Sequence, residues 1–316
     1  MTSIVLQTKN LTKRYGSLTA VKDLNLGIQQ GEIFGLLGPN GAGKTTSINL
    51  MCGLLKPDAG HVYIHGKAVN GGDAEIRSRV GVCPQTTVLW GKLTPLEQLE
   101  FIGEMYGLGR KAARRRGQEL LEIMGLTERK NHLASTLSGG MQRRLNIILA
   151  LVHDPDILAL DEPEAGLDPQ SRVLVREYVR EWARQHNRTV ILTTHNMDEA
   201  DRMAGRVAII DHGELLVLNT PEALKRQVGE GDVLEIDLDG AQGLPLERGL
   251  DFVVKLVPQT SLVGRTLVIR AKGIVDLLTV ITDTLREAGF QPGEIRLREN
   301  TLEDVFIALT GRRLRE

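Results

Sequence analysis

One stretch decides how the rest of the sequence is interpreted: Gly38-Pro39-Asn40-Gly41-Ala42-Gly43-Lys44-Thr45. It follows the apolar run Ile33–Leu37, which predicts a buried β-strand, and it leads into Thr45–Gly53, which predicts a helix. The glycines allow successive backbone N–H groups to converge on one anion, and the positive N-terminal end of the helix adds to the attraction. The stretch therefore predicts a phosphate-binding loop, in which Lys44 reaches the β- and γ-phosphates of a nucleotide and the Thr45 hydroxyl binds Mg²⁺.

Three further apolar runs predict buried strands of the same sheet: Val80–Cys83, Ile157–Leu160 and Val190–Thr194. Helical stretches separate these runs, which is typical of a largely parallel α/β sheet. Ligands bind outside the carboxyl ends of the strands in open sheets of this kind. We therefore expect the polar residues that directly follow these strands to form one site.

Two carboxylates, Asp161 and Glu162, come directly after the strand predicted at Ile157–Leu160. Asp161 is suited to hold Mg²⁺ through its water shell. Glu162 is suited to polarise an attacking water as a general base. An apolar run that ends in Asp-Glu is a weak signal by itself, but after a phosphate-binding loop it becomes a strong one.

A third motif lies between the first two and reads Leu137-Ser138-Gly139-Gly140-Met141-Gln142. With it, the chain resembles the ATP-binding cassette (ABC) family, whose signature reads LSGGQ; here Met141 precedes the glutamine. The order of phosphate-binding loop, signature and Asp-Glu also agrees with that family. The resemblance implies that Ser138, Gly139 and Gly140 cap the γ-phosphate of ATP bound to a second copy, so that a homodimer of cassettes encloses two nucleotides.

The resemblance extends over about residues 1–225 and implies roles for further side chains. Gln85 matches the glutamine that approaches Mg²⁺ and the attacking water and couples the cassette to its membrane partner. His195, after the strand Val190–Thr194, matches the histidine that contacts the γ-phosphate. Asp168 matches an aspartate that crosses the dimer interface, and Tyr15 matches the aromatic residue that stacks on adenine.

These matches divide the expected site residues by role. The catalytic residues are Glu162, His195 and Gln85, and the Mg²⁺ ligands are Thr45, Gln85 and Asp161. One departure from the family is Glu164, where relatives usually carry Thr or Ser, and it adds a carboxylate near the expected interface. The residues expected to bind ATP are Tyr15, Gly38, Pro39, Asn40, Gly41, Ala42, Gly43, Lys44, Thr45 and Thr46.

The pattern of elements predicts a P-loop α/β cassette over residues 1–228, with an inserted helical subdomain at about 92–152. Within the insertion, Thr94-Pro95-Leu96-Glu97 predicts a helix start with an N-cap, a first-turn proline and a capping-box glutamate. A small α+β domain is expected over 232–316, after Gly229-Glu230-Gly231. Its expected elements are strands at Val233–Leu238, Phe252–Leu256, Thr266–Ala271 and Glu294–Arg298, a helix at Ile274–Ala288, and a last helix that opens at Thr301 with Asp304 as its capping-box acid.

We expect this small domain to fold separately around its own apolar core. Alternating strand residues and one face of the last helix supply that core. The residues expected in it are Val233, Ile236, Val254, Leu267, Ile269, Leu302, Val305, Phe306 and Leu309.

Composition narrows the possible functions and the compartment. The 316 residues are 41% hydrophobic and 25% charged, which allows a packed core. A net charge of −1, with only 5 Phe, 4 Tyr and 2 Trp, argues against nucleic acid as a partner. Cys52 and Cys83 predict reduced, buried thiols. No apolar run approaches the roughly 18–20 residues that span a bilayer, and no signal peptide is expected, so we predict a cytoplasmic protein, peripheral on the inner face of the cell membrane.

Three functions compete. A P-loop kinase or GTPase leaves Ser138–Gly140 and His195 unexplained. A soluble ABC ATPase that acts on nucleic acid or ribosomes would carry two cassettes or a long coiled coil before the signature, but only 52 residues lie between Gln85 and Ser138. The sequence therefore favours the ATP-binding and hydrolysing subunit of an ABC transporter whose permease is a separate chain.

The direction of transport is indicated by residues 299–311, which read ENTLEDVFIALTG. This resembles the LEDVF…LTG ending of cassettes that pair with ABC-2-type permeases, a group that includes exporters related to daunorubicin efflux. We therefore expect export of a small molecule, such as a drug, a lipid, a polysaccharide or an ion. An importer ATPase with a C-terminal regulatory domain and a soluble ABC ATPase not involved in transport are the alternatives.

Overall fold

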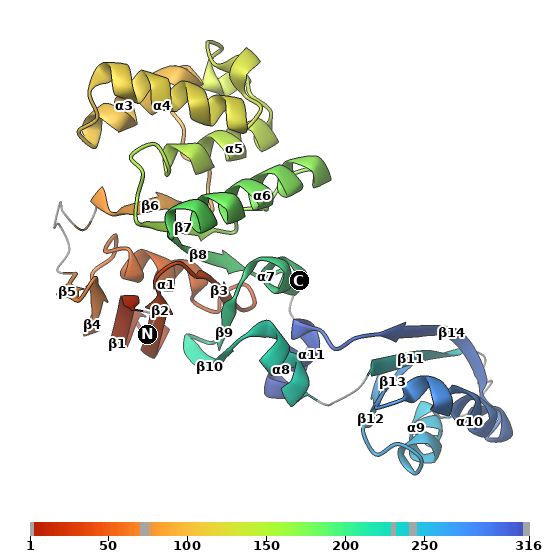
Figure 1. The fold of residues 1–316 in the computed structure, drawn as a ribbon. Coiled ribbons are helices and arrows are strands. Elements are labelled where there is room, and N and C mark those ends of the chain that lie inside the picture. Colours follow the sequence, from red (N-terminus) through yellow and green to blue (C-terminus); the bar gives the residue numbers. More distant parts are fainter. Residues whose placement is uncertain (1–2, 70–75, 77, 229–231, 240–244, 312–316) are drawn as a thin grey trace. The chain divides into compact units, whose positions relative to one another are not determined.

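The computed structural model describes residues 3–69, 76, 78–228, 232–239 and 245–311. The described residues up to Thr220 form one compact unit, and those from Pro221 form a second (Figure 1). This division precedes the boundary predicted at residue 228, because helix α8 (Pro221–Gln227) packs against α11 (Leu302–Thr310) in the second unit. Burial of Leu224 on α8 is the physical reason.

A six-stranded sheet with the order β10-β9-β3-β8-β7-β6 lies at the centre of the first unit. Its strands are β3 (Ile33–Leu37), β6 (Val80–Cys83), β7 (Ile157–Asp161), β8 (Thr189–Thr194), β9 (Arg206–Asp211) and β10 (Glu214–Asn219). All run parallel except β10, which pairs antiparallel with β9 at the edge. The four predicted strands are confirmed, whereas β9 and β10 were not predicted.

The central strands bury side chains on both faces of the sheet. On β7, Ile157 and Ala159 belong to one apolar cluster, and Leu158 and Leu160 belong to another. This is the usual pattern of a parallel sheet that is covered on both sides, because successive side chains point to opposite faces.

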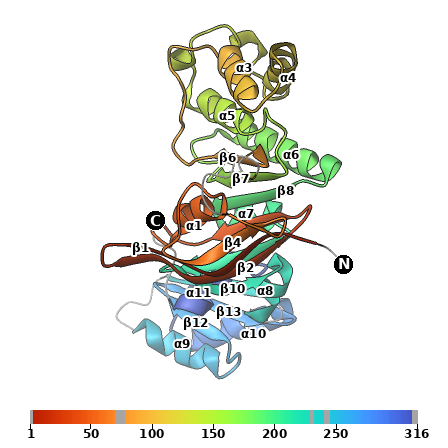
Figure 2. The ribbon, with the colours of Figure 1, turned by 90° about the vertical axis from the view of Figure 1, so that its left-hand side faces the viewer.

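Different elements cover the two faces (Figures 1 and 2). One face carries α1 (Lys44–Met51) and a four-stranded sheet, and the other carries α5 (Gly139–Leu149) and α6 (Pro169–His186). A further short helix, α7 (Met197–Met203), follows β8. The four-stranded sheet has the order β2-β1-β4-β5 and consists of β1 (Ile4–Tyr15), β2 (Leu18–Gln29), β4 (Ala59–Ile64) and β5 (Lys67–Ala68).

The helical subdomain lies between β6 and β7 in the sequence. It contains α3 (Pro95–Met105), α4 (Arg110–Ile123), the 3₁₀ turns η1 (Thr127–Arg129) and η2 (Ala134–Thr136), and α5. The predicted capping box of α3 is confirmed, because Glu97 N donates to Thr94 Oγ1 (3.2 Å) and Thr94 N donates to Glu97 Oε2 (2.8 Å).

The second unit is a four-stranded antiparallel sheet with the order β12-β13-β11-β14. Its elements are β11 (Asp232–Asp239), α9 (Leu246–Val254), β12 (Thr260–Val263), β13 (Thr266–Ala271), α10 (Ile274–Glu287), β14 (Gln291–Arg298) and α11. The strand predicted at Phe252–Leu256 is wrong, because that segment ends helix α9. Leu246, Leu250, Val253 and Val257 recur at helical spacing and face the same core.

The expected core of this unit is confirmed only in part. Leu302, Val305 and Phe306 are buried on α11 but lie outside the apolar cluster under the sheet, because α11 packs against α8. Ile236, Leu267 and Ile269 lie in the core as predicted. Val233 is buried outside that cluster, since it precedes Leu234 on β11 and points to the opposite face. Two further residues differ from the prediction: Val254 is half-buried and Leu309 is exposed.

Helix α11 begins with the predicted capping box. Asp304 N donates to Thr301 Oγ1 (3.3 Å), and Thr301 N donates to Asp304 Oδ2 (2.9 Å). The buried Asp304 carboxylate also pairs with Arg270 on β13 (2.7 Å) and with Arg298 on β14 (2.6 Å). One side chain therefore ties the start of α11 to two strands.

Both cysteines are buried as predicted. Burial raises the pKa of the Cys52 thiol to about 12 and that of the Cys83 thiol to about 11, so neither is a reactive thiolate. Among the described residues, no helix combines the length and the apolar character needed to cross a bilayer.

Candidate functional site

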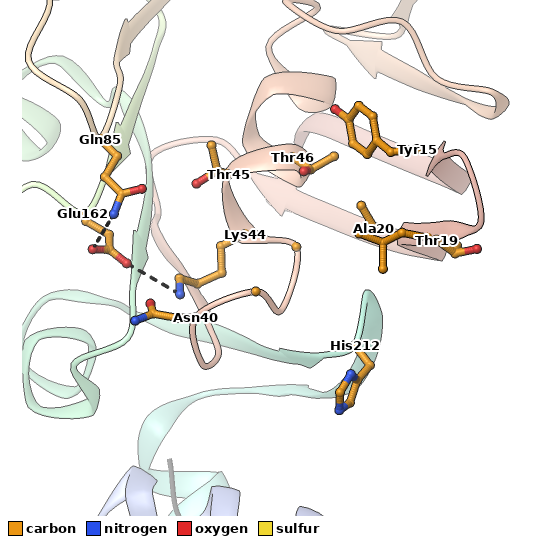
Figure 3. A pocket seen from close by; sticks show the side chains of 13 residues that line it. Tyr15, Thr19, Ala20, Asn40, Lys44, Thr45, Thr46, Gln85, Glu162 and His212 are labelled. Atoms are coloured by element: carbon orange, nitrogen blue, oxygen red, sulfur yellow. Dashed lines mark hydrogen bonds and ion pairs between the residues drawn. The ribbon is translucent and has the colours of Figure 1, made fainter. Parts of the chain in front are cut away.

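A cavity of about 460 Å³ opens beside the loop that joins β3 to α1, and we call it the P-loop cavity (Figure 3). Tyr15 lies on one side of it, and Gln85 and Glu162 lie on the other, with the loop between them. The predicted site residues that line it are Tyr15, Asn40, Gly41, Gly43, Lys44, Thr45, Thr46, Gln85 and Glu162.

The backbone of the loop accepts only glycine at key positions. Gly43 has φ +99°, and a Cβ there would fall 2.2 Å from the carbonyl oxygen of Ala20. A Cβ on Gly38 would fall 2.3 Å from the carbonyl oxygen of Ile210. Helix α1 begins at Lys44 without a side-chain cap, so its first backbone N–H groups remain available to an anion.

Lys44 is held over the loop by backbone oxygens. Its Nζ donates to the carbonyls of Gly38 (2.8 Å) and Pro39 (3.1 Å), and it lies 3.6 Å from Glu162 Oε1. Burial lowers the pKa of Lys44, while the carboxylates of Glu162 and Asp161 oppose that shift. The ammonium group is therefore held at the wall of the P-loop cavity, between the loop carbonyls and the Glu162 carboxylate.

Glu162 is the centre of the polar network at the strand ends. Gln85 Nε2 donates to its Oε2 (3.1 Å), and His195 Nδ1 hydrogen-bonds to its Oε1 (3.0 Å). Residues that follow β6, β7 and β8 thus meet at one carboxylate. Glu162 has φ +50°, a strained conformation for a residue with a side chain, and such strain is concentrated at functional sites.

The residues expected to hold Mg²⁺ offer the oxygen donors that this ion prefers. Gln85 gives its amide nitrogen to Glu162, which leaves its amide oxygen available to a cation. The Thr45 hydroxyl lines the cavity. Asp161 is buried, does not line the cavity and accepts a hydrogen bond from Thr193 Oγ1, so that any contact of its carboxylate with an ion in the cavity would go through water.

The signature residues Ser138 to Gly140 do not line the described P-loop cavity of their own chain. Ser138 caps α5, since its Oγ accepts from Met141 N (3.3 Å), and Ser138 and Gly139 are exposed. A Cβ on Gly140 would lie 3.7 Å from Asp168 Oδ2. Asp168 in turn caps α6 by accepting from Ser171 N (3.0 Å), so the two motifs form one exposed surface.

The predictions missed four lining residues: Leu18, Thr19, Ala20 and His212. His212 follows β9 at the carboxyl edge of the same sheet, so the rule used for the other strands would have found it had β9 been predicted. Glu164, the residue that departs from the family pattern, adds no unpaired charge near the site. Arg176 pairs with it through two hydrogen bonds of 2.9 and 2.7 Å.

Comparisons with known proteins agree with this geometry. A family model described as ABC transporter matches residues 21–165. The linearmycin resistance ATP-binding protein LnrL of Bacillus subtilis is 36% identical over 99% of this chain and 100% of its own length. The chain belongs to the ABC transporter family.

Other relatives of the cassette align along its whole length. The Nod factor export ATP-binding protein I of Ralstonia nicotianae is 38% identical over 99% of this chain and 95% of its own. The daunorubicin resistance ATP-binding protein DrrA2 of Streptomyces coeruleorubidus is 35% identical over 99% of this chain and 97% of its own length.

A solved structure resembles the cassette as well. It is a dimeric, post-hydrolysis ATP-binding cassette bound to ADP and Pi, with a TM-score of 0.64 and 29% identity, covering 68% of this chain and 98% of the other. The cassette therefore has the predicted P-loop α/β fold. It is an ATP-binding subunit of an ABC transporter and an ABC-type ATPase.

Proposed function

We propose that this cassette energises export of a small molecule through a separate ABC-2-type permease. The observation that carries the proposal is the match along nearly the full length to relatives named for antibiotic resistance or export. The match includes the second unit, where the LEDVF…LTG ending forms helix α11.

Within the proposed site, each side chain has a chemical task. Lys44 and the loop N–H groups bind the β- and γ-phosphates of ATP, and Tyr15 stacks on adenine. Thr45, Gln85 and Asp161 would hold Mg²⁺, which would neutralise charge that develops on the phosphates. Glu162 accepts a proton from the attacking water, with Gln85 and His195 fixing the direction of its carboxylate.

A second copy of the chain completes this site. Ser138, Gly139 and Gly140 are exposed or half-exposed and lie outside the cavity of their own chain, which supports a role on the nucleotide of the partner copy. A Ser138→Arg chain mixed with a Lys44→Ala chain would then lack any dimer with two intact sites. We expect wild-type specific activity to rise with protein concentration, and strict proportionality down to monomer concentrations would contradict the shared site.

The contact with the permease is proposed at a second cavity, of about 350 Å³, in the first unit. Its apolar lining includes Leu54, Val88 and Trp90, which are 58%, 64% and 46% exposed. Exposed apolar patches of this kind mark interaction sites. Pro84 lines this cavity, and the next residue, Gln85, lines the P-loop cavity, so pressure from a permease segment would reach the hydrolytic site directly. Such a contact would hold the cassette at the cytoplasmic face of the membrane, which is the location proposed for it.

Inverted membrane vesicles test the direction of transport. Vesicles that contain the cassette and a co-expressed ABC-2-type permease should accumulate daunorubicin or linearmycin when ATP is added outside. The Glu162→Gln chain is the control and should abolish accumulation. ATP-dependent uptake only into right-side-out vesicles loaded with ATP would assign the cassette to an importer.

A further inference from the structure

Arg143, on the second turn of the signature helix α5, is a buried cation with an unusual set of partners. Only 3% of it is exposed. Its Nη1 donates to the carbonyls of Pro84 (2.6 Å) and Gln85 (3.1 Å), and its Nη2 donates to those of Asp161 (2.6 Å) and Glu162 (2.8 Å). Its Nε donates to the carbonyl of Pro163 (3.4 Å). All five acceptors are main-chain oxygens.

These acceptors belong to two separate segments, and each segment carries a residue of the hydrolytic site. One segment follows β6 and holds Gln85, and the other begins at Asp161, the last residue of β7, and holds Glu162. Carbonyls at or beyond the end of a strand are not fully paired by the sheet and need other donors. The rigid planar fork of an arginine reaches both segments at once, which the single nitrogen of a lysine cannot do.

Arg143 also belongs to the helix that begins with the signature. Asn146, one turn later on the same face, donates to Cys83 Sγ (3.2 Å) and to the Pro84 carbonyl (3.5 Å). The buried face of α5 is therefore attached to the Gln85 segment at two levels. Its exposed N-terminal turn, Ser138 to Gly140, is the part proposed to act on the second copy's nucleotide.

We infer that Arg143 is a positioning residue for ATP hydrolysis, which fixes the Gln85 and Glu162 backbones to the signature turn so that both move as one body. The inference rests on the proposed function of Glu162 and of the shared site. The consequence is a direct link between the two ATP sites of a dimer. A displacement at the signature of one copy is transmitted through Arg143 to the carboxylate that serves the same copy's own nucleotide.

Loss of this fork should affect turnover and not ATP binding. Glu162 is strained, and without Arg143 its backbone is free to relax. A misplacement of about 1 Å can cost about 10²-fold in rate. Lys44 and Tyr15 make no contact with Arg143 among the hydrogen bonds and ion pairs described, so the affinity for ATP should stay within about twofold of the wild-type value.

The test compares Arg143→Gln and Arg143→Lys in the full-length chain, with Arg144→Lys as the matched control. Arg144 is the next residue on α5, and its Nη1 donates to the Met124 carbonyl (2.6 Å) in the helical subdomain, away from both segments. ATP affinity, kcat, KM and the melting temperature are measured for each chain. We expect kcat to fall at least tenfold in Arg143→Gln, less in Arg143→Lys, and not in the control.

Mixing experiments test the link between the sites. If a mixed dimer of wild-type and Arg143→Gln chains loses both sites, activity should follow the square of the wild-type fraction. A linear dependence would mean that each chain affects only its own nucleotide and would overturn the link.

Three other outcomes would overturn the proposal. They are a kcat within twofold of wild type in Arg143→Gln, parallel loss of kcat and ATP affinity, and failure of both Arg143 variants to fold, which would assign the residue to stability alone. Glu162→Gln, measured in parallel, separates the role of Glu162 as the base from the role of Arg143 in positioning it. Normal turnover in that chain would refute the proposed base together with its positioning residue, whereas loss of turnover there but not in Arg143→Gln refutes the positioning role only.

Discussion

At the scale of single residues, the site is assembled around Glu162. Lys44, Gln85 and His195 reach its carboxylate from three other segments, and its backbone adopts φ +50°. The residue was predicted from an Asp-Glu pair that follows an apolar strand. That Gln85 and His195 share its site was predicted too, but the strained backbone of Glu162 and the hydrogen bonds of both residues to its carboxylate could not be, because they arise only when distant strand ends meet.

Replacement of Glu162 separates nucleotide binding from chemistry. Glu162→Gln keeps the shape and hydrogen bonding of the side chain but cannot accept a proton. We expect ATP affinity to persist and turnover to fall by about 10²–10⁴-fold, as for loss of a general base. Gel filtration with ATP should show an accumulated dimer. Lys44→Ala is the contrasting control, since it should lose binding and turnover together.

We expect Glu199 to make the stability of the first unit depend on pH. Its carboxylate is buried on α7 and accepts a hydrogen bond from Thr194 Oγ1 (2.6 Å). Burial, supported by the charges of Glu164 and Glu162, raises the pKa of Glu199 from 4.5 to about 7. The folded chain thus holds a proton that the unfolded chain releases between these values, and folding weakens as pH rises through this range.

Glu199→Gln should remove this dependence. A pKa raised from 4.5 to about 7 corresponds to about 3 kcal/mol of stabilisation, present below pH 4.5 and lost by about pH 7 and above. The free energy of unfolding, measured with urea at pH 5.5 and pH 8.5, should therefore fall more for the wild type than for the variant between these two pH values. Glu177→Gln, at an exposed position on α6, is the control. An equal response in the two variants would refute the assignment to Glu199.

At the scale of elements, sequence reasoning succeeded where apolar runs had one interpretation. The strands β3, β6, β7 and β8 are buried on both faces, so their runs are continuous and end in polar site residues. It failed at α9, where Phe252–Leu256 is too short to distinguish a strand from a helix. It also missed β12, a four-residue strand whose side chains are not buried.

Asp304 should contribute more to the stability of the start of α11 than an ordinary capping residue does. Burial alone would raise the pKa of Asp304, but Arg298 and Thr301 hold it well below its usual range. Asp304→Ala leaves Arg270 and Arg298 without this partner, and we expect a loss of about 3 kcal/mol from the second unit. The control Asp283→Asn removes an exposed pair with Arg286 and should cost under about 1 kcal/mol.

Measurements at low pH separate the charge interactions of Asp304 from its contribution to packing. Because the pKa of Asp304 is lowered in the folded chain, its stabilisation is complete above the ordinary value of 3.8 and is lost as pH falls below it. The difference between wild type and Asp304→Ala should therefore narrow between pH 5 and pH 2. A difference that stays constant over this range would show that the charge contributes nothing.

At the scale of the whole molecule, the division at Thr220 guides how the chain can be cut. Truncation after Gly229 leaves α8 without α11 and exposes Leu224, whereas truncation after Thr220 removes both helices. We expect the chain of residues 1–220 to bind ATP and to remain monodisperse in light scattering, while the chain of residues 1–229 binds ATP but self-associates. If ATP binding disappears in both, the second unit is part of the nucleotide site.

The order of strands also determines the point during synthesis at which the chain can form its ATP site. Strand β3, which leads into the P-loop, pairs only with β8 and β9 in the described sheet, and these follow it by about 150 residues. At a synthesis rate of about 5–20 residues per second, an apolar strand near the start of the chain waits for about 8–30 s without its neighbours. We therefore expect a nascent chain stalled before β8 and β9 have emerged to retain no ATP, and one stalled after them to bind it.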